Sequence, residues 1–576
     1  MTSYSHVSTG WENLDRIIDH LRRGDNVVWQ VDSIDDYQRL VCLFVNNALS
    51  NDERVVYIRF ARHMPLLEEK KGITIYRLRV ERGFEFFSTE VHGIITREGK
   101  DVHYVFDSLS DLLHVWATDL MIGDFFYITC PYLYELNTIA YFAIQRNCHS
   151  FKAIARIRET TQVLIDAYSY KRKLCIHPLK VERRYSPTMF FPHIKEKGEL
   201  LPVINSVEAT RLFTHLSRHS SVAAHRHLDY WDRLFMQAKK LLESDAGEDE
   251  KLDMVEQLSR LFLSRNKRIL ALIRKYFTLQ DLLQIKERLI GTGFIGGKSL
   301  GMLLSRKILA LDQSFKWEEK LEHHDSFYIG SDVFYSYIVQ NGWWKLLMAH
   351  KTREGYFARA TELRNKMLAG HFPEEIKEQF QLMLEYFGQS PIIVRSSSLL
   401  EDAFGSAFSG KYESFFCVNQ GPPAKRYQDF EDAVKKIFAG TMNEDALAYR
   451  LQRGLDQSDE QMALLVQRVS GAYRKNYFFP ELAGVGLSHN PFVWRKGMDA
   501  KAGMLRLVFG LGTRAVNRVE NDYPRIVALD EPLVRPLSEM KDIKKFSQHY
   551  IDILNLEKNR LETVSLRELT KKRLDT

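Results

Sequence analysis

Short apolar runs alternate with helical patterns through the first third of the sequence, and this alternation restricts the fold more than any other feature. The runs include NVVWQV from Asn26, RVVYIRF from Arg54 and HYVFDSL from His103. Between the first two runs lies YQRLVCLFVNNAL, whose apolar residues recur with the period of an amphipathic helix. Alternating buried strands and helices are typical of a parallel sheet covered by helices. We therefore predict an α/β domain over residues 1–200.

The pattern changes twice more along the chain. Residues 201–290 carry long segments of helical period, such as YWDRLFMQAKKLLES, and predict a helical connector. Residues 291–540 contain more glycine together with mixed strand and helix signals, which predicts a second, α+β domain. The charged segment 541–576 reads as a helical tail. The predicted fold class is thus a multidomain α/β protein.

Charge and cysteine content exclude several functional classes. The chain has 81 basic and 74 acidic residues, a net charge of +7 with both signs interspersed, which predicts no nucleic-acid partner. No apolar run is long enough to span a bilayer, and the N-terminus lacks the features of a signal peptide. The five cysteines show no metal-ligand spacing. We expect a soluble cytoplasmic protein with free thiols and no membrane partner.

The loop GTGFIGGKSLGML, which begins at Gly291, has some features of a phosphate-binding P-loop. Its spacing differs, because Thr292 stands where the first glycine of a P-loop is required. The preceding segment, LQDLLQIKERLI, has helical period, whereas a P-loop follows a buried strand. Lys298 and the helix start beside it nevertheless suit phosphate oxygens.

A second candidate segment is PIIVRSSSLLEDAFGSAFSGKYESFF, which begins at Pro391. The apolar run predicts a strand that delivers Arg395 into a serine-rich turn at residues 396–398. Arginine binds phosphate in a bidentate manner and stays charged at any physiological pH. Serine hydroxyls and the glycines that follow, Gly405 and Gly410, add donors and a backbone that can approach an anion closely. The two segments together predict a polyphosphate clamp.

These residues resemble a known family. IIVRSSSLLEDAFGSAFSGKYESFF is similar to the V-R-S-S-x-x-x-E-D signature of the nucleotide-binding (PEP/pyruvate-binding) domain of phosphoenolpyruvate synthase and pyruvate phosphate dikinase. IGGKSLGML, LLVQRVSGAYRKNYFFPELAGVGLSHNP and VFGLGTRAVNRVENDYPR resemble three further blocks of that domain, in the same order. The resemblance covers roughly residues 285–540. It implies an ATP-grasp-like domain that uses ATP and Mg²⁺ and transfers a phosphoryl group to a histidine on a neighbouring mobile domain. That mobile domain carries the phosphoryl group to pyruvate.

The resemblance also implies roles for individual residues. Lys298 and Arg395 would hold the ATP phosphates and act in catalysis, because phosphoryl transfer depends on positioning and positive charge. Gln467 and Val469 would lie against the adenine. Other residues at motif positions are Ser396, Ser409 and Gly410 near the phosphates, and the acidic Glu401, Asp402 and Glu413, for which loop-orienting hydrogen bonds or indirect magnesium contacts are expected.

The chain departs from the family pattern in several places. The closing Q-x-R strand, which supplies magnesium ligands, is missing after Pro536, and Thr513 stands where many relatives carry glutamate. Neither the T-S-H-A-A phosphohistidine segment nor the pyruvate-binding barrel is present. Three explanations remain open: the chain is a fragment, a partner domain acts in cis or in trans, or the domain binds nucleotide without turnover.

The first domain resembles the RecA-like ATPases of the KaiC type in its opening, STGWENLDRIIDHLRRGDNVVWQV, and in HYVFDSLSDLL, where Asp107 takes the magnesium-orienting position. In place of a P-loop, however, the chain reads VDSIDDYQRL, with Asp32, Asp35 and Asp36. Two like charges about 4 Å apart repel by about 4 kcal/mol at an effective dielectric constant near 20, so these carboxylates oppose a triphosphate. We predict a degenerate RecA-like scaffold used for regulation or partner docking.

Three functional hypotheses follow. The first is an ATP-dependent phosphotransferase module of the phosphoenolpyruvate synthase kind. The second is a nucleotide-sensing regulatory or scaffold protein that binds ATP without turnover. The third is a dikinase that acts on another acceptor, since related domains phosphorylate glucans or antibiotics.

Overall fold

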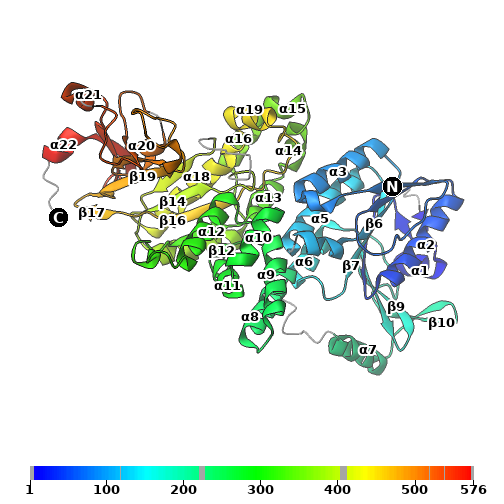
Figure 1. The fold of residues 1–576 in the computed structure, drawn as a ribbon. Helices are drawn as coiled ribbons and strands as arrows, with labels where there is room; N and C mark the ends of the chain where they lie inside the picture. The colour runs from blue at the N-terminus through cyan, green and yellow to red at the C-terminus, as the bar shows by residue number, and fades with distance from the viewer. Residues whose placement is uncertain are drawn as a thin grey trace.

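The computed structural model describes residues 6–116, 118–219, 228–401, 411–517, 519–537 and 539–571. The N-terminal domain and the last small sheets lie at opposite ends of the molecule, with helices of the middle of the chain between them (Figure 1). The observed mixture of sheets and covering helices confirms the multidomain α/β class.

The N-terminal domain is built on a nine-stranded sheet of order β11-β10-β9-β8-β3-β7-β6-β4-β5. The six strands from β8 to β5 in this order are parallel to their neighbours, as predicted, and β9 to β11 add an antiparallel extension. The bounds are β3 (Asn26–Val31), β4 (Val55–Arg59), β5 (Ile73–Arg77), β6 (His103–Ser108), β7 (Ile139–Gln145), β8 (Val163–Tyr170), β9 (Lys173–Val181), β10 (His193–Glu196) and β11 (Glu199–Pro202).

Helices cover both faces of this sheet, which explains why its central strands read as continuous apolar runs. Every residue of β6 is buried, and α2 packs on one face while α3 and α5 pack on the other. A short pair of strands, β1 (His6–Val7) and β2 (Leu21–Arg22), precedes the sheet. The helices are α1 (Glu12–Ile18), α2 (Ile34–Ser50), α3 (Phe84–Glu98), α4 (Leu113–Trp116), α5 (Asp119–Glu135) and α6 (Phe151–Thr160).

The connector is helical, as its periodicity predicts. Its apolar faces meet in one cluster around Trp231, Phe262 and Leu282. The last connector helix begins with a capping box, in which Thr278 and Asp281 bond to each other's backbone N–H groups. The bounds are α7 (Ser206–His219), α8 (Tyr230–Glu243), α9 (Glu248–Phe262), α10 (Lys267–Tyr276) and α11 (Leu279–Glu287).

The C-terminal half contains a five-stranded sheet of order β12-β13-β16-β14-β15, mostly antiparallel. The strands are β12 (Leu289–Ile290), β13 (Ser326–Ile329), β14 (Ile392–Ser396), β15 (Ser414–Cys417) and β16 (Leu464–Arg468). Its helices are α12 (Gly297–Leu311), α13 (Ser331–Gln340), α14 (Trp344–His350), α15 (Gly355–Ala358), α16 (Ala360–Ala369), α17 (Glu374–Phe387), α18 (Pro423–Gly440) and α19 (Glu444–Gln452).

Two smaller sheets follow. One of them includes residues of the segment 541–576, so the prediction of a helical tail there is wrong. Residues 550–565 form a hairpin, β22 (Tyr550–Asn555) and β23 (Arg560–Ser565), whose first strand pairs with β18. The two sheets have the orders β17-β18-β22-β23 and β19-β20-β21. Their other elements are β17 (Ala472–Arg474), β18 (Tyr477–Phe479), β19 (Leu482–Leu487), β20 (Met504–Phe509), β21 (Arg525–Ala528), α20 (Thr513–Val516), α21 (Met540–Lys545) and α22 (Leu566–Lys571).

The N-terminal and C-terminal halves share one apolar core. A single cluster of buried side chains runs from Val28 and Phe125 of the first domain to Phe334 and Val466 of the second. Helices α5 and α13 pack against each other, and the Ser336 hydroxyl donates to the Asp124 carboxylate at 2.7 Å across this contact. None of the helices in the described ranges has the length and apolar character needed to cross a membrane.

Candidate functional site

Two glycines bring the start of α12 against the serine turn, residues 396–398. Gly296 has a φ angle of +80°, and a Cβ atom there would lie 1.3 Å from the Ser397 carbonyl oxygen. A Cβ atom on Gly297 would lie 2.0 Å from the Glu401 carbonyl oxygen, and the Gly297 N–H donates to the Ser398 carbonyl at 3.1 Å. These glycines are therefore required for close approach of two backbones.

Lys298 lies in the first turn of α12 and points to the serine turn. Its Nζ donates to Glu401 Oε1 at 2.8 Å and to Ser396 Oγ at 2.9 Å. Glu401 is buried, and its second oxygen accepts from the Ser398 N–H at 2.9 Å. The side chain of Lys298 remains 22% exposed. Glu401 thus orients both the lysine and the turn, in agreement with the loop-orienting role predicted for it.

Arg395 and Gln467 lie on neighbouring strands. Arg395 is opposite Leu465 in the pairing of β14 with β16, and its Nη1 donates to Gln467 Oε1 at 3.5 Å. The Gln467 amide also donates to Ser326 Oγ at 3.2 Å. Lys298 of α12 contacts Ser396, the residue that follows Arg395. Four predicted site residues therefore lie in one continuous region at this part of the sheet: Lys298, Arg395, Ser396 and Gln467.

The remaining predicted residues are less closely connected. Val469 follows β16, where its N–H donates to the Pro391 carbonyl at 2.9 Å and its side chain packs against Phe478 and Leu511. Glu413 is exposed just before β15. Asp402, Ser409 and Gly410 lie outside the described residues.

The C-terminal hairpin carries a carboxylate that the sequence analysis missed. Asp552 on β22 accepts hydrogen bonds from the hydroxyls of Thr513 and Thr563, each at 2.6 Å, and forms an ion pair with Arg514 at 3.1 Å. Two strands do follow Pro536, although neither YIDILN nor RLETVS contains the Q-x-R sequence. The alternation in YIDILN and RLETVS, separated by a short polar turn, could have indicated the hairpin.

The described residues do not provide a ready magnesium site. Among them, no group of three or more histidine, cysteine, aspartate or glutamate side chains could hold a metal ion. Asp552 already has three protein partners, one of them the Arg514 cation.

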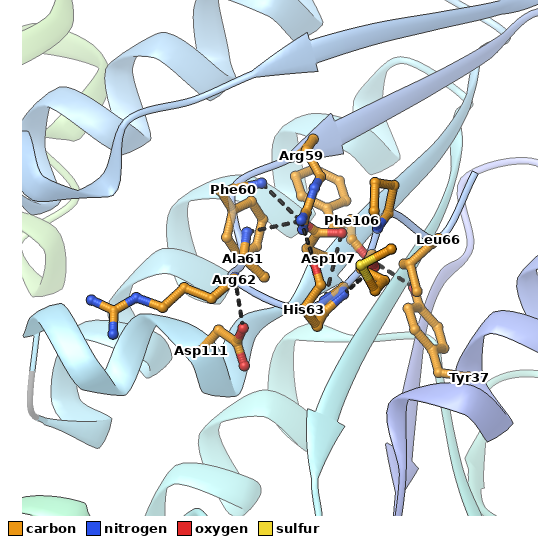
Figure 2. A network of polar contacts seen from close by, with 12 residues as sticks. Tyr37, Arg59, Phe60, Ala61, Arg62, His63, Leu66, Phe106, Asp107 and Asp111 are labelled. Atoms are coloured by element: carbon orange, nitrogen blue, oxygen red, sulfur yellow. Dashed lines mark hydrogen bonds and ion pairs between the residues drawn. The ribbon is translucent and has the colours of Figure 1, made fainter. Parts of the chain in front are cut away.

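In the N-terminal domain, Asp107 is fully buried and satisfied by protein groups (Figure 2). Its Oδ1 accepts from the Tyr57 hydroxyl at 2.5 Å. Its Oδ2 accepts from Arg59 at 2.6 Å and from the N–H groups of Phe60 and Ala61, each at 2.8 Å. Burial, followed by the Asp107 charge, raises the pKa of Tyr57 well above its ordinary value. The carboxylate predicted in the magnesium-orienting position therefore binds its own domain.

Side chains also bind one another in VDSIDDYQRL, the segment where the RecA-like resemblance predicts a P-loop. Asp32 forms an ion pair with Arg146 at 2.5 Å, and Arg146 contacts Asp166 through both terminal nitrogens. At the start of α2, Ser33 Oγ accepts from the Asp36 N–H at 3.2 Å. A helix N-terminus capped in this way offers fewer free N–H groups to a phosphate.

A serine, a histidine and an aspartate form a hydrogen-bonded chain near the same edge of the sheet. The Ser110 hydroxyl lies 2.7 Å from His149 Nε2, and His149 Nδ1 lies 2.7 Å from Asp119 Oδ1. The order of groups is that of a nucleophilic triad. However, all three side chains are buried, and the Ser110 oxygen also accepts from the Gln145 N–H at 2.7 Å. This chain therefore ties three segments together, and its serine oxygen is already used by two protein groups.

Comparison with known proteins identifies the second half of the chain. Residues 292–575, just under half of the protein, match the family of the pyruvate phosphate dikinase AMP/ATP-binding domain. The hairpin at residues 550–565 lies within the matched range. A rifampicin phosphotransferase of Bacillus cereus is 24% identical over 157 residues, which cover 27% of this chain and 16% of that protein. A phosphoenolpyruvate synthase of Pseudomonas aeruginosa is 28% identical over 112 residues, or 19% of this chain and 13% of that protein.

These aligned segments are short relative to the relatives themselves. The chain spans about one sixth of the length of the rifampicin phosphotransferase. The family match begins at residue 292, so the N-terminal domain lies outside it and its RecA-like character remains a prediction.

Proposed function

We propose, from the premise that residues 292–575 form an AMP/ATP-binding domain of the pyruvate phosphate dikinase kind, that this half of the chain binds ATP as a phosphoryl donor. The observation that carries the proposal is the hydrogen bond from Lys298 to Ser396, directly after Arg395. It brings a lysine and an arginine that are distant in sequence to the same turn. We call Lys298, Arg395 and the serine turn the phosphate clamp.

The hydrogen-bonding capacity of the clamp fits a phosphate ligand. A lysine ammonium has three donors, and Lys298 uses two of them on Glu401 and Ser396. One donor is then left for a phosphate oxygen. Arg395 would add a planar, permanently charged guanidinium, and the positive charge of both residues would stabilise a transferring phosphoryl group.

The rest of the nucleotide is assigned by position along the sheet. Gln467 and Val469, at the end of β16 toward the last small sheets, would lie against the adenine. Ser409 and Gly410 would belong to the loop that covers the phosphates. Magnesium, bound through the phosphates, would neutralise charge on the oxygens while the chain's own residues hold the triphosphate in place.

The phosphoryl acceptor would come from elsewhere. The relatives are named a rifampicin phosphotransferase and a phosphoenolpyruvate synthase, which offers an antibiotic or pyruvate as final acceptors. A phosphohistidine or pyruvate domain, in cis or in trans, would complete the reaction.

A second candidate function is nucleotide sensing without turnover. It is favoured by Asp552, the carboxylate of the final hairpin, whose charge is balanced by Arg514 at 3.1 Å. Two threonine hydroxyls occupy its other lone pairs. A domain in this condition could bind ATP and yet activate it poorly.

We also propose that the N-terminal domain is a RecA-like scaffold that has lost its own ATP site. The parallel order β8-β3-β7-β6-β4 and the position of Asp107 at the end of β6 support the likeness. The hydrogen bonds that Asp107 accepts from Tyr57 and Arg59 support the loss.

Isothermal titration with ATP and Mg²⁺ tests the proposal. We expect Arg395→Ala and Lys298→Ala each to weaken ATP affinity tenfold or more, since hydrogen bonds to charged groups contribute about 1.5 to 3 kcal/mol. Lys307→Ala is the matched control, because Lys307 lies on the same helix but pairs with Asp281 at 2.7 Å. Unchanged affinity in both clamp variants would overturn the assignment. Release of AMP from ATP would separate a dikinase from a sensor.

A further inference from the structure

The start of α3 in the N-terminal domain meets a carboxyl group of the C-terminal half. The Phe86 N–H donates to Asp459 Oδ1 at 3.0 Å, and Asp459 is in the segment between α19 and β16. Gly83, with a φ angle of +106°, leaves the space: a Cβ atom there would lie 2.2 Å from Asp459 Oδ2. Asp459 therefore caps a helix of the other domain, because its oxygen accepts from an N–H group in the first turn of α3.

Buried charges surround this contact. Glu85, next to Phe86, forms an ion pair with Lys351 at 2.8 Å and accepts from the Tyr335 hydroxyl at 3.2 Å. Lys351 also donates to the Ser458 carbonyl at 3.2 Å, and the Gln461 N–H donates to the Tyr335 hydroxyl at 3.3 Å. Lys351 and Tyr335 belong to the C-terminal half, and Glu85 contacts both, so α3 reaches the two ends of residues 458–461 through these side chains.

The same segment holds the phosphate clamp. The Ser398 hydroxyl donates to the Glu460 carbonyl at 2.9 Å, while the Glu460 carboxylate is paired with buried Arg450 at 2.9 Å. The Ser398 N–H then donates to Glu401, which binds Lys298. Hydrogen bonds, together with the peptide bond between Asp459 and Glu460, therefore connect α3 to Lys298 of the clamp.

We propose that Asp459 is a positioning residue through which the N-terminal domain holds the serine turn, so that ATP affinity in the C-terminal half depends on the contact between α3 and residues 458–461. The inference rests on the proposed ATP-binding function and adds a role for the N-terminal domain. A clamp works only if its donors are already placed, because ordering them at the moment of binding costs affinity. The buried contacts supply that placement.

Three substitutions at Asp459 test the proposal by titration of the full chain with ATP and Mg²⁺. Asp459→Ala removes the acceptor for the Phe86 N–H, and we expect the Kd for ATP to rise about fivefold or more, the size of one lost hydrogen bond. Asp459→Asn keeps an oxygen in the same position, so we expect its Kd to stay within about twofold of the wild type. Asp459→Leu, similar in size but without an acceptor, should weaken binding as Asp459→Ala does, which separates the lost hydrogen bond from a loss of packing alone.

The control variant disturbs the contact between the two halves at a position outside the phosphate clamp. Lys345→Ala breaks an exposed ion pair between the halves, in which Lys345 lies 3.2 Å from Glu135. We expect it to bind ATP like the wild type. If Asp459→Ala does not fold, Gly83→Ala displaces the carboxyl from the opposite side and should weaken ATP binding in the same direction.

The outcomes separate the two proposals. No ATP binding by the wild-type chain would remove the proposed function itself. Loss of binding in Lys298→Ala together with wild-type affinity in Asp459→Ala and Gly83→Ala would overturn only the positioning role. Equal weakening by Lys345→Ala would also overturn it, since any disturbance of the interface would then suffice.

Discussion

Asp459 accepts a hydrogen bond from the backbone N–H of Phe86 at 3.0 Å, although 373 residues separate the two in sequence. The contact joins a helix start in one domain to the segment that supports a glycine-serine contact in the other. Several acidic and basic side chains face it: Glu85 on α3, Lys351 after α14, Arg450 on α19, Glu460 beside it and Arg265 from the connector. This environment gives the contact a predictable dependence on pH.

Stability should fall with rising pH because of Asp459. Burial, followed by the Glu85 charge, raises the pKa of Asp459 from 3.8 to about 8. Burial alone would also raise the pKa of Glu85, but the Lys351 ammonium lowers it, so the pair holds one proton and that proton is on Asp459. The folded state then binds a proton that the unfolded state has lost. The contribution is present at low pH and decreases as the pH rises toward about 8.

Urea unfolding at about pH 6 and about pH 9 checks this sign. We expect the wild type to lose unfolding free energy relative to Asp459→Asn over this range, because asparagine cannot ionise. Asp445→Asn, at an exposed position of α19, should follow the wild type. A parallel response of the wild type and Asp459→Asn would contradict the protonated state assigned to Asp459.

The contact between Gly296 and Ser397 predicts a large effect of a single methyl group. In Gly296→Ala the new Cβ would overlap the Ser397 carbonyl, and the φ angle of +80° would add strain. We expect a loss of about 3 kcal/mol or more in unfolding free energy. Gly301→Ala, on the same helix with open space around it, should instead gain up to about 1 kcal/mol. Chemical denaturation of both variants measures the difference, and similar stabilities would contradict the described backbone approach.

The Asp107 network predicts a structural rather than a nucleotide-binding role for the first domain. Asp107→Ala would remove the buried carboxylate that pairs with Arg59 and accepts from Tyr57, and we expect a loss of about 3 to 5 kcal/mol in stability. ATP should bind with unchanged affinity and a stoichiometry of one per chain. Asp35→Asn, in the exposed first turn of α2, is the control expected to change neither quantity. A stoichiometry of two would show that the N-terminal domain retains an ATP site.

The buried chain from Ser110 through His149 to Asp119 predicts resistance to serine-directed reagents. The Ser110 oxygen accepts from the Gln145 N–H and is buried, so a fluorophosphonate should not label it in the folded protein. Mass spectrometry of the treated chain checks this, with the unfolded chain as the comparison. Labelling of Ser110 in the native protein, and its loss in His149→Ala, would indicate an activated nucleophile instead.

Local patterns were sufficient for much of the fold. The apolar runs from Asn26 and His103 became β3 and β6 because a strand buried on both faces must be apolar throughout. The connector helices followed from their periodic apolar faces. The hairpin at residues 550–565 was missed, since its first strand is specified by pairing with β18, more than seventy residues earlier, as in the partners Phe478 and Leu554.

By itself, the sequence determined the chemistry that can be placed at the candidate site: which residues carry charge, which glycines allow close approach, and which motif they form. Only the tertiary structure decided that Glu401 orients Lys298 and that Asp107 accepts hydrogen bonds from Tyr57 and Arg59. The physical reason is that a hydrogen bond forms between groups that meet in space, and the groups that meet here come from separate elements brought together by burial of a shared core.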